Sequence, residues 1–334
     1  MDFLKSIAKD IGNEYVSLAS EIDESETFVD TGSFIFNALC SGSIRGGISG
    51  NKITAIAGES STGKTFFALA VVKNYLDSNP GAGCVYFDTE SAITRSLLDE
   101  RGIDTSRVLV TNVVTIEDFR SQALKIVDNY LKQPEDKRQP LMFVLDSLGM
   151  LSTNKEIEDA LAEKNVRDMT KSQLVKGAFR MLTLKLGQAQ IPMIVTNHTY
   201  DVIVAYVPTK EMGGGSGLKY SASTIIYLSK KKEKDGKDIV GNIIKAKTAK
   251  SRLSKENQQV EIRLYYDERG LDRYYGLLEL GELGGMWKNV AGRYEIDGKK
   301  LYAKQILAEP EKYFTEEVMD KLDVIAQGTF SYGG

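Results

Sequence analysis

The sequence predicts an α/β fold in which helices flank a doubly wound, mainly parallel sheet. Between Thr31 and about Ser223, four apolar runs of four or five residues alternate with longer stretches of helical spacing. None of the runs shows the polar alternation that one solvent-exposed face would impose, so each is expected to be a strand buried on both faces. The runs are Ile53–Ala57, Cys84–Phe87, Leu141–Leu145 and Met193–Thr196.

The stretches between these runs would connect the strands as helices. Two parallel strands need a crossover of a dozen or more residues, which is usually a helix. Each crossover brings the chain back to the same side, so the carboxyl ends of the strands lie together at one edge of the sheet. The helices are expected at about 64–77, 91–101, 117–131 and 168–188.

Residues 1 to about 22 are expected to form a separate helix. Phe3, Ile7 and Ile11 recur at four-residue spacing, and Tyr15 continues the series, which places all four on one helix face. Two interpretations remain open. The helix either packs on the core of its own chain or forms an arm that docks on a neighbouring subunit.

After Gly217 the pattern changes to longer strands and short helices. Residues 224–247 are typical of two strands joined by a turn at Asp235 and Gly236, and 260–267 is a further strand. The charged residues around the turn are expected to be solvated. Short helical pieces are expected near the end of the chain, around 304–307 and 316–325.

Composition limits the possible classes of protein. The 334 residues suffice for one large domain or two modest ones. The net charge of −3, from 43 Lys+Arg and 46 Asp+Glu, excludes a wholly basic nucleic-acid coat but not a local basic surface. Two cysteines, Cys40 and Cys84, form no CxxC pair, and no signal peptide or membrane-spanning run is present. A soluble cytoplasmic protein is therefore expected.

The most specific local signal is a glycine-rich segment between the run Ile53–Ala57 and an apolar helix. It satisfies the pattern GxxxxGK[ST], in which backbone N–H groups surround phosphate oxygens and the helix N-terminus adds its positive end. Lys64 would reach the β- and γ-phosphates, and the Thr65 hydroxyl would ligate Mg²⁺. The chain is thus expected to bind a nucleoside triphosphate. The segment consists of Gly58, Glu59, Ser60, Ser61, Thr62, Gly63, Lys64 and Thr65.

Three other strands end in polar residues at the same expected edge. Asp146 can hold Mg²⁺ through water, although an aspartate here can also simply cap the next helix. Glu90 can orient and deprotonate a water that attacks the γ-phosphate, and Asp88 is the alternative base. His198, the only histidine, can sense the γ-phosphate or serve a structural role.

The order of these motifs resembles the RecA-type recombinases, and within them the UvsX branch of phages. GESSTGKT, YFDTE, LDSLG, TNHTY and GGGSGLKYSAS follow one another within a likeness that runs from about Thr31 to Gly281. The resemblance implies a RecA-like P-loop ATPase core with an antiparallel extension of its sheet. It divides the chain into an N-terminal helix and polymerisation arm (1–30), the core (31–280) and a small C-terminal region (281–334).

The resemblance also implies an activity and partners. These proteins polymerise on single-stranded DNA and exchange strands with a homologous duplex, with ATP and Mg²⁺ as cofactors and DNA-stimulated ATP hydrolysis. A single-stranded DNA-binding protein and a recombination mediator are implied as partners. Two alternatives stay open: a hexameric helicase or ring ATPase on the same core, and a nucleotide-gated DNA-binding mediator that does not hydrolyse ATP.

By the same resemblance, several residues receive roles in catalysis. Glu90 matches the catalytic carboxylate, Asp146 supports the metal, and His198 links the ATP state to the DNA-binding loop behind it. Lys250 and Arg252 match the cations that reach the ATP of the adjacent subunit. The alternative pair for that role is Lys245 and Lys247.

The DNA-binding loops of the family correspond to about 152–168 and 199–217 here. The first is acidic, which argues against phosphate contact along its whole length. The residue that matches the adenine-stacking aromatic is Leu97, so the resemblance leaves the nucleotide preference open. The candidate DNA-binding residues are Arg180, Lys210, Gly213, Gly214 and Gly215.

Overall fold

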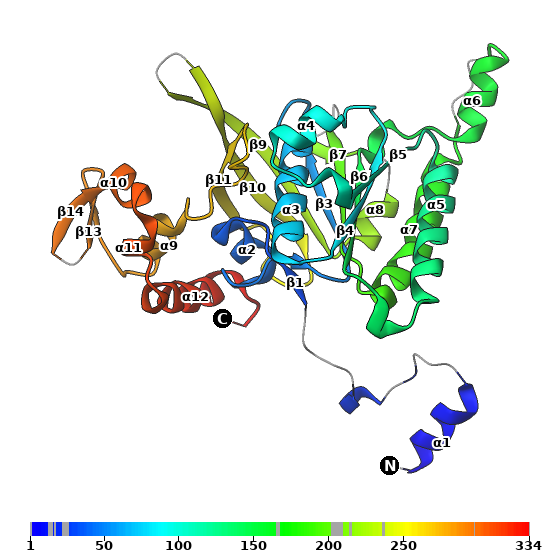
Figure 1. Cartoon of the computed structure of the whole chain (residues 1–334), viewed down its shortest axis with the longest axis horizontal. Helices are drawn as coiled ribbons and strands as arrows, with labels where there is room; N and C mark the ends of the chain where they lie inside the picture. Colours follow the sequence, from blue (N-terminus) through cyan, green and yellow to red (C-terminus); the bar gives the residue numbers. More distant parts are fainter. Residues whose placement is uncertain are drawn as a thin grey trace.

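A nine-stranded sheet forms the centre of the protein in the computed structural model (Figure 1). The structure describes residues 2–12, 16, 18–21, 27–164, 168–201, 210–213, 216–235, 238–296 and 298–333. The strand order is β11-β10-β9-β3-β7-β6-β4-β5, and β8 pairs with the end of β7. From β9 to β5 all neighbours are parallel, whereas β10 and β11 are antiparallel. The predicted doubly wound sheet with an antiparallel extension is therefore confirmed.

The four predicted buried runs occupy adjacent positions in this sheet, as β3, β7, β6 and β4. β7 extends five residues beyond the predicted run, to Asp201, because β8 pairs with its end. The predicted hairpin is β9 and β10, and the glycine of its expected turn lies outside the described residues. The bounds are β3 (Ile53–Gly58), β4 (Gly83–Asp88), β5 (Val108–Asn112), β6 (Leu141–Asp146), β7 (Met193–Asp201), β8 (Lys210–Met212), β9 (Thr224–Asp235), β10 (Asp238–Ser251) and β11 (Gln259–Tyr265).

Helices cover both faces of the sheet, which explains why its central strands are apolar on both sides. Along β4, Cys84 and Tyr86 belong to one apolar cluster, whereas Val85 and Phe87 belong to the other. The first cluster is covered by α2 (Phe34–Ser41), α3 (Lys64–Ser78) and α4 (Arg95–Glu100), and the second by α5 (Ile116–Leu131), α7 (Lys171–Ala189) and α8 (Ser216–Ser221). No helix in the described part of the chain is long and apolar enough to cross a membrane.

Two of the predicted crossover helices begin later than expected. α4 begins at Arg95 because the Thr94 side chain accepts a hydrogen bond from the N–H of Leu97 and so caps the helix. α7 begins at Lys171, after a turn in which Asp168 accepts bonds from the Thr170 main chain and side chain. Before it, α6 (Asn154–Leu161) occupies the first expected DNA-binding loop. The remaining short helices are η1 (Ala19–Glu21), η2 (Thr105–Arg107), η3 (Glu135–Lys137) and η4 (Leu148–Met150).

The N-terminal helix is shorter than predicted, and its apolar face is open. α1 (Asp2–Ile11) ends at Gly12, whose φ of 61° terminates the helix, and Tyr15 lies outside the described residues. Phe3 is 75% exposed and Ile11 56% exposed. Figure 1 shows α1 apart from the sheet. The interpretation that this helix packs on its own core is therefore wrong for the chain on its own.

At the end of the predicted N-terminal arm, the strand β1 (Phe28–Val29) pairs antiparallel with β2 (Ile48–Ser49) of the same chain. This short ribbon precedes the core and lies close to α2, because Asp30 and Thr31 bond to the Asn37 side chain. It joins the N-terminal segment to the central domain.

The C-terminal segment packs against α2 and the edge of the sheet. Helices are confirmed near both predicted places, as α10 (Ala303–Ala308) and α12 (Glu316–Phe330), but the three-stranded sheet between them and α9 was not predicted. Asp323 of α12 accepts hydrogen bonds from the Ser43 hydroxyl (2.7 Å) and the Ile44 N–H (2.8 Å). The other elements are α9 (Leu277–Leu283), β12 (Asn289–Val290), β13 (Arg293–Ile296), β14 (Lys299–Tyr302) and α11 (Pro310–Tyr313).

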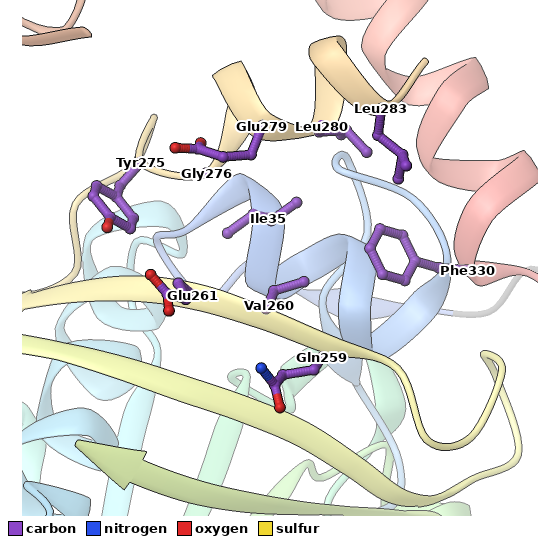
Figure 2. A pocket seen from close by; sticks show the side chains of 10 residues that line it. All are labelled: Ile35, Gln259, Val260, Glu261, Tyr275, Gly276, Glu279, Leu280, Leu283 and Phe330. Atoms are coloured by element: carbon purple, nitrogen blue, oxygen red, sulfur yellow. The ribbon is translucent and has the colours of Figure 1, made fainter. Parts of the chain in front are cut away.

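A pocket of about 230 Å³ lies where this segment meets the core (Figure 2). Its walls are mainly apolar and come from α2, β11, α9 and α12, with Ile35, Val260, Leu280 and Phe330 among them. The volume is below the roughly 300–1,000 Å³ of usual small-molecule sites. None of the residues that the sequence assigns to nucleotide binding lines it.

Replacing Gly281 with alanine should destabilise the contact between α9 and the indole of Trp287. A Cβ at residue 281 would lie 2.2 Å from Trp287 Cζ2, and the ring is held by its Nε1–H bond to the Leu278 carbonyl (2.7 Å). Overpacking of this kind costs about 1–3 kcal/mol. Thermal unfolding should therefore show a lower Tm, by roughly 2–4 °C per kcal/mol.

Gly328→Ala is the matched control, because Gly328 is also helical and nothing lies within 4 Å of the added Cβ. It should leave the Tm unchanged or raise it, since alanine favours a helix over glycine by about 1 kcal/mol. Equal melting temperatures for the two variants would contradict the predicted overlap.

Candidate functional site

The register of the parallel strands brings the predicted residues to one edge of the sheet. Gly58 at the end of β3 is the partner of His198 on β7, and Asp88 at the end of β4 is the partner of Asp146 on β6. β7 and β6 are neighbours in the same sheet. The ends of β3, β4 and β6, together with His198 within β7, therefore form a continuous row at the carboxyl edge, where α/β sheets bind ligands.

The glycine-rich loop between β3 and α3 has the geometry of a phosphate cradle. Gly63 caps α3 with φ 90°, a backbone conformation that L side chains rarely adopt. A Cβ on Gly58 would lie 2.8 Å from both the Leu228 carbonyl oxygen and the Thr62 hydroxyl. The tip, Glu59 to Ser61, is exposed ahead of the helix N-terminus. A loop of this shape fits phosphate oxygens.

Lys64 is buried against the inside of this loop. Its Nζ donates to the carbonyl oxygens of Gly58 (3.0 Å) and Glu59 (2.8 Å). Burial lowers the pKa of Lys64, and the nearby carboxylates of Asp146 and Glu90 oppose that shift. The ammonium group is thus kept at the cradle by bonds that a phosphate can replace.

Asp146 is held by donors from the two neighbouring strands. Its Oδ2 accepts a hydrogen bond from the Tyr86 hydroxyl of β4 (2.7 Å), and its Oδ1 accepts one from the Thr196 hydroxyl of β7. Burial, together with the Asp146 charge, raises the pKa of Tyr86 well above its usual range, so the phenol remains a donor. The peptide bond from Asp146 to Ser147 is cis.

The residues at this edge fit Mg²⁺ bound together with a nucleotide. The protein offers the carboxylate of Asp146 and the hydroxyl of Thr65, which are both oxygen donors of the kind that Mg²⁺ prefers. Within the described ranges, no group of three or more His, Cys, Asp or Glu side chains forms a dedicated metal site.

The two candidate bases differ clearly in their surroundings. Asp88 is 2% exposed, and its two oxygens accept the N–H groups of Glu90 (3.0 Å) and Ile93 (2.9 Å), so it shapes the turn after β4. The Glu90 side chain is 37% exposed. Its Oε1 accepts a hydrogen bond from the Ser147 hydroxyl (2.9 Å) and lies 3.4 Å from His198 Nε2. Of the two carboxylates, only that of Glu90 belongs to a partly exposed side chain.

His198 connects this edge to the loop that follows β7. Its carbonyl oxygen accepts a hydrogen bond from the N–H of Gly213 (3.0 Å), and the Asn197 amide donates to the Gly213 carbonyl (2.7 Å). A Cβ on Gly213 would lie 2.7 Å from the Tyr200 ring, so this close return of the chain requires glycine. Gly214 and Gly215 lie outside the described residues, as does the side chain of Lys210.

Lys250 and Arg252 lie away from the carboxyl edge of their own chain. Lys250 on β10 and Ala55 on β3 both pair with Ile225 of β9, so they lie at the same level in the sheet. Ala55 lies three residues, or about 10 Å, before Gly58 along β3. Its Nζ donates to the carbonyls at the end of α8, those of Lys219 (2.7 Å), Tyr220 (3.2 Å) and Ala222 (2.7 Å).

The other residues singled out from the sequence lie in different parts of the central domain. Arg252 is exposed, and its side chain makes no hydrogen bond or ion pair within the described part of the chain. Lys245 and Lys247 lie nearer the P-loop edge along β10, and Lys245 pairs with Glu261 (3.7 Å). Arg180 is exposed on α7, and Leu97 packs against the apolar core from α4.

Sequence reasoning missed three residues at the site. Tyr86 and Thr196 hold Asp146, and Lys230 of β9 donates to the Ser61 carbonyl at the loop tip. Tyr86 and Thr196 could have been found from the sequence, because each places a hydroxyl within an otherwise apolar buried strand. A buried hydroxyl needs a hydrogen-bond partner. Lys230 was not singled out, because it belongs to the charged residues near the predicted hairpin turn, all of which were expected to be solvated.

Comparison with known proteins adds to this geometry. The family model described as RecA N-terminal domain matches residues 1–272. The chain is 35% identical over 277 residues to the recombination and repair protein of Enterobacteria phage T4, which covers 83% of this chain and 69% of that protein. It is 28% identical to the RecA proteins of a Nocardioides species (77% of this chain, 70% of that protein) and of Clavibacter michiganensis (84% and 75%). With the phosphate cradle and the row of strand-end residues at one sheet edge, these matches lead to one conclusion: the chain belongs to the RecA family of recombinases.

Proposed function

We propose that this protein is an ATP-dependent homologous recombinase. It polymerises on single-stranded DNA, pairs it with a homologous duplex and exchanges strands, and DNA stimulates its ATP hydrolysis. The observation that carries the proposal is a bonded connection between the nucleotide edge of the sheet and the loop expected to bind DNA. The edge that holds the P-loop, Glu90 and Asp146 also holds His198, whose main chain is bonded to the loop expected to bind DNA.

In the proposed reaction, each residue at the edge has one task. Lys64 exchanges its two loop carbonyls for phosphate oxygens. Asp146 and Thr65 would hold Mg²⁺, which neutralises phosphate charge when bound. Glu90 accepts a proton from the water that attacks the γ-phosphate, and the Ser147 hydroxyl keeps its carboxylate in place (2.9 Å).

The nucleotide state reaches the DNA through His198. Its Nε2 lies 3.4 Å from Glu90 Oε1. A γ-phosphate beside Glu90 offers the imidazole a second partner, and any shift of His198 moves Gly213 through their main-chain bond. The proposed DNA contacts are Gly213 and its neighbours Gly214, Gly215 and Lys210, together with Arg180 on α7. Backbone amides and cations bind phosphates with little base preference.

The proposal also includes self-association. Lys250 and Arg252 lie too far along the sheet to serve their own P-loop, which supports a role at the nucleotide of the adjacent subunit. The exposed apolar face of α1 supports an arm that docks on a neighbour, since such a face is unfavourable in water. DNA-dependent activity then follows, because complete sites exist only between assembled subunits.

The deciding measurement is steady-state ATP hydrolysis with and without single-stranded DNA at two salt concentrations. Strong stimulation that weakens with salt supports the recombinase, because phosphate contacts lose affinity as salt rises. Hydrolysis that is indifferent to DNA would indicate a ring ATPase instead. Tight ATP binding without turnover would indicate a nucleotide-gated binding protein.

Glu90→Gln should stop turnover while leaving binding intact. The amide keeps the size of the side chain but cannot accept the proton, so DNA-stimulated kcat should fall about 10²–10⁴-fold. Affinities for ATP and single-stranded DNA should change by no more than a few-fold. Glu100→Gln, at an exposed acid on α4, is the control and should hydrolyse normally. Normal turnover by Glu90→Gln would remove Glu90 as the base.

Mixing two inactive variants tests whether the site is shared between subunits. Arg252→Ala alone should lose most activity, since a cation of this kind contributes about 10³–10⁵ in rate when fully engaged. In a 1:1 mixture with Glu90→Gln, about one head-to-tail interface in four pairs an intact Glu90 with an intact Arg252. The mixture should regain roughly that fraction of DNA-stimulated hydrolysis.

Arg252 is preferred to Lys250 for this test, because replacing Lys250 also removes the bonds that end α8. Activity of the mixture equal to the mean of the two separate variants would place the cation outside the shared site.

A further inference from the structure

Three neighbouring strands contribute one buried hydrogen-bonded group. Tyr86 lies on β4, Asp146 on β6 and Thr196 on β7, and these strands are consecutive in the sheet. Tyr86 and Thr196 have no exposed surface, and Asp146 is 6% exposed. The carboxylate is thus at the boundary between the closed interior and the edge of the nucleotide site.

The two hydroxyls fix the orientation of this carboxylate. One accepting oxygen is bonded to Tyr86 from one side and the other to Thr196 from the other side, so rotation about the Cβ–Cγ bond would break both bonds. An ionised carboxylate has about four lone-pair sites, and two donors leave about two of them. The remaining sites are left for donors at the carboxyl edge, where β6 ends at Asp146.

The need for both donors follows from burial. Burying a carboxylate is strongly unfavourable unless hydrogen bonds within the protein replace those it made to water. Neither hydroxyl is required for packing alone, because phenylalanine and valine have the same shapes without the polar atom. Their neighbours on the same faces of β4 and β7 are apolar residues such as Cys84 and Ile194.

We propose that Tyr86 and Thr196 are positioning residues that hold the Asp146 carboxylate aimed outward, so that it accepts hydrogen bonds from the water shell of nucleotide-bound Mg²⁺. This inference rests on the proposed function only in taking a Mg²⁺–nucleotide as the ligand. Tyr86 and Thr196 are inferred to support only the gain in nucleotide affinity that Mg²⁺ provides. The part due to the P-loop and Lys64 is independent of the pair.

The test compares nucleotide affinity with and without Mg²⁺. Calorimetric titration with a non-hydrolysable ATP analogue, in Mg²⁺ and in EDTA, gives for each protein the factor by which Mg²⁺ tightens binding. In Tyr86→Phe this factor should fall about 10-fold, the size usual when a residue that orients a metal-binding group is lost. The affinity in EDTA should stay within about twofold of the wild-type value, a change of less than about 0.4 kcal/mol.

Two further comparisons separate positioning from packing. Tyr75→Phe removes a phenol from another buried tyrosine of the same apolar cluster and should keep the wild-type Mg²⁺ factor. Thr196→Ser keeps the donor and should also keep the factor, whereas Thr196→Val keeps the shape and should lose it. Thermal unfolding without nucleotide shows which variants are folded. If Tyr86→Phe does not fold, the comparison of Thr196→Ser with Thr196→Val tests the inference in its place.

An unchanged Mg²⁺ factor in folded Tyr86→Phe or Thr196→Val would overturn the inference. A wild-type protein that binds no nucleotide in either condition would overturn the proposed function instead. The two failures are therefore distinguishable in one set of titrations.

Discussion

The in-register parallel pairing of β3, β7, β6 and β4 is the constraint on which the candidate site depends. It sets Gly58 beside His198 and Asp88 beside Asp146 without help from any loop. A shift by one residue would turn each side chain to the opposite face of its strand. Both faces are packed with apolar side chains, so such a shift would exchange the contents of two separate cores. The packing of the two apolar cores thus also fixes the positions of the site residues.

The same packing explains which parts of the fold were readable from the sequence. Strands buried on both faces must be apolar throughout, and this made the four central runs and their crossovers visible. β5 was not predicted, because it lies at the sheet edge and its Leu109 is 60% exposed. α2 was missed for the opposite reason, since it is buried almost all round and lacks a polar face. The strands β12 to β14 have two to four residues each, too few to establish a period.

For the site, the sequence could identify strand ends but not the partners of each side chain. That Glu90 and not Asp88 is open to solvent depends on the turn that Asp88 itself caps, a local bond that strand alternation alone does not reveal. The position of the Lys250 amine on the end of α8 depends on two elements about 30 residues apart in the chain. The partners of Asp146 come from strands 60 and 50 residues away. Contacts of this range follow from tertiary packing and are invisible to local patterns.

The position of Lys250 and Arg252, away from the carboxyl edge of their own sheet, has a consequence for any assembly that uses them. A subunit that receives cations at one end and offers them at the other joins its neighbours head to tail, and such contacts do not close on themselves as a twofold dimer does. Where the rotation between subunits does not close a ring, the two ends of the open assembly are chemically unlike. One terminal subunit carries a nucleotide that no neighbour completes, and the other carries cations that reach no nucleotide. Exchange of subunits with solution would differ between the ends, so the polymer would have an intrinsic direction of growth.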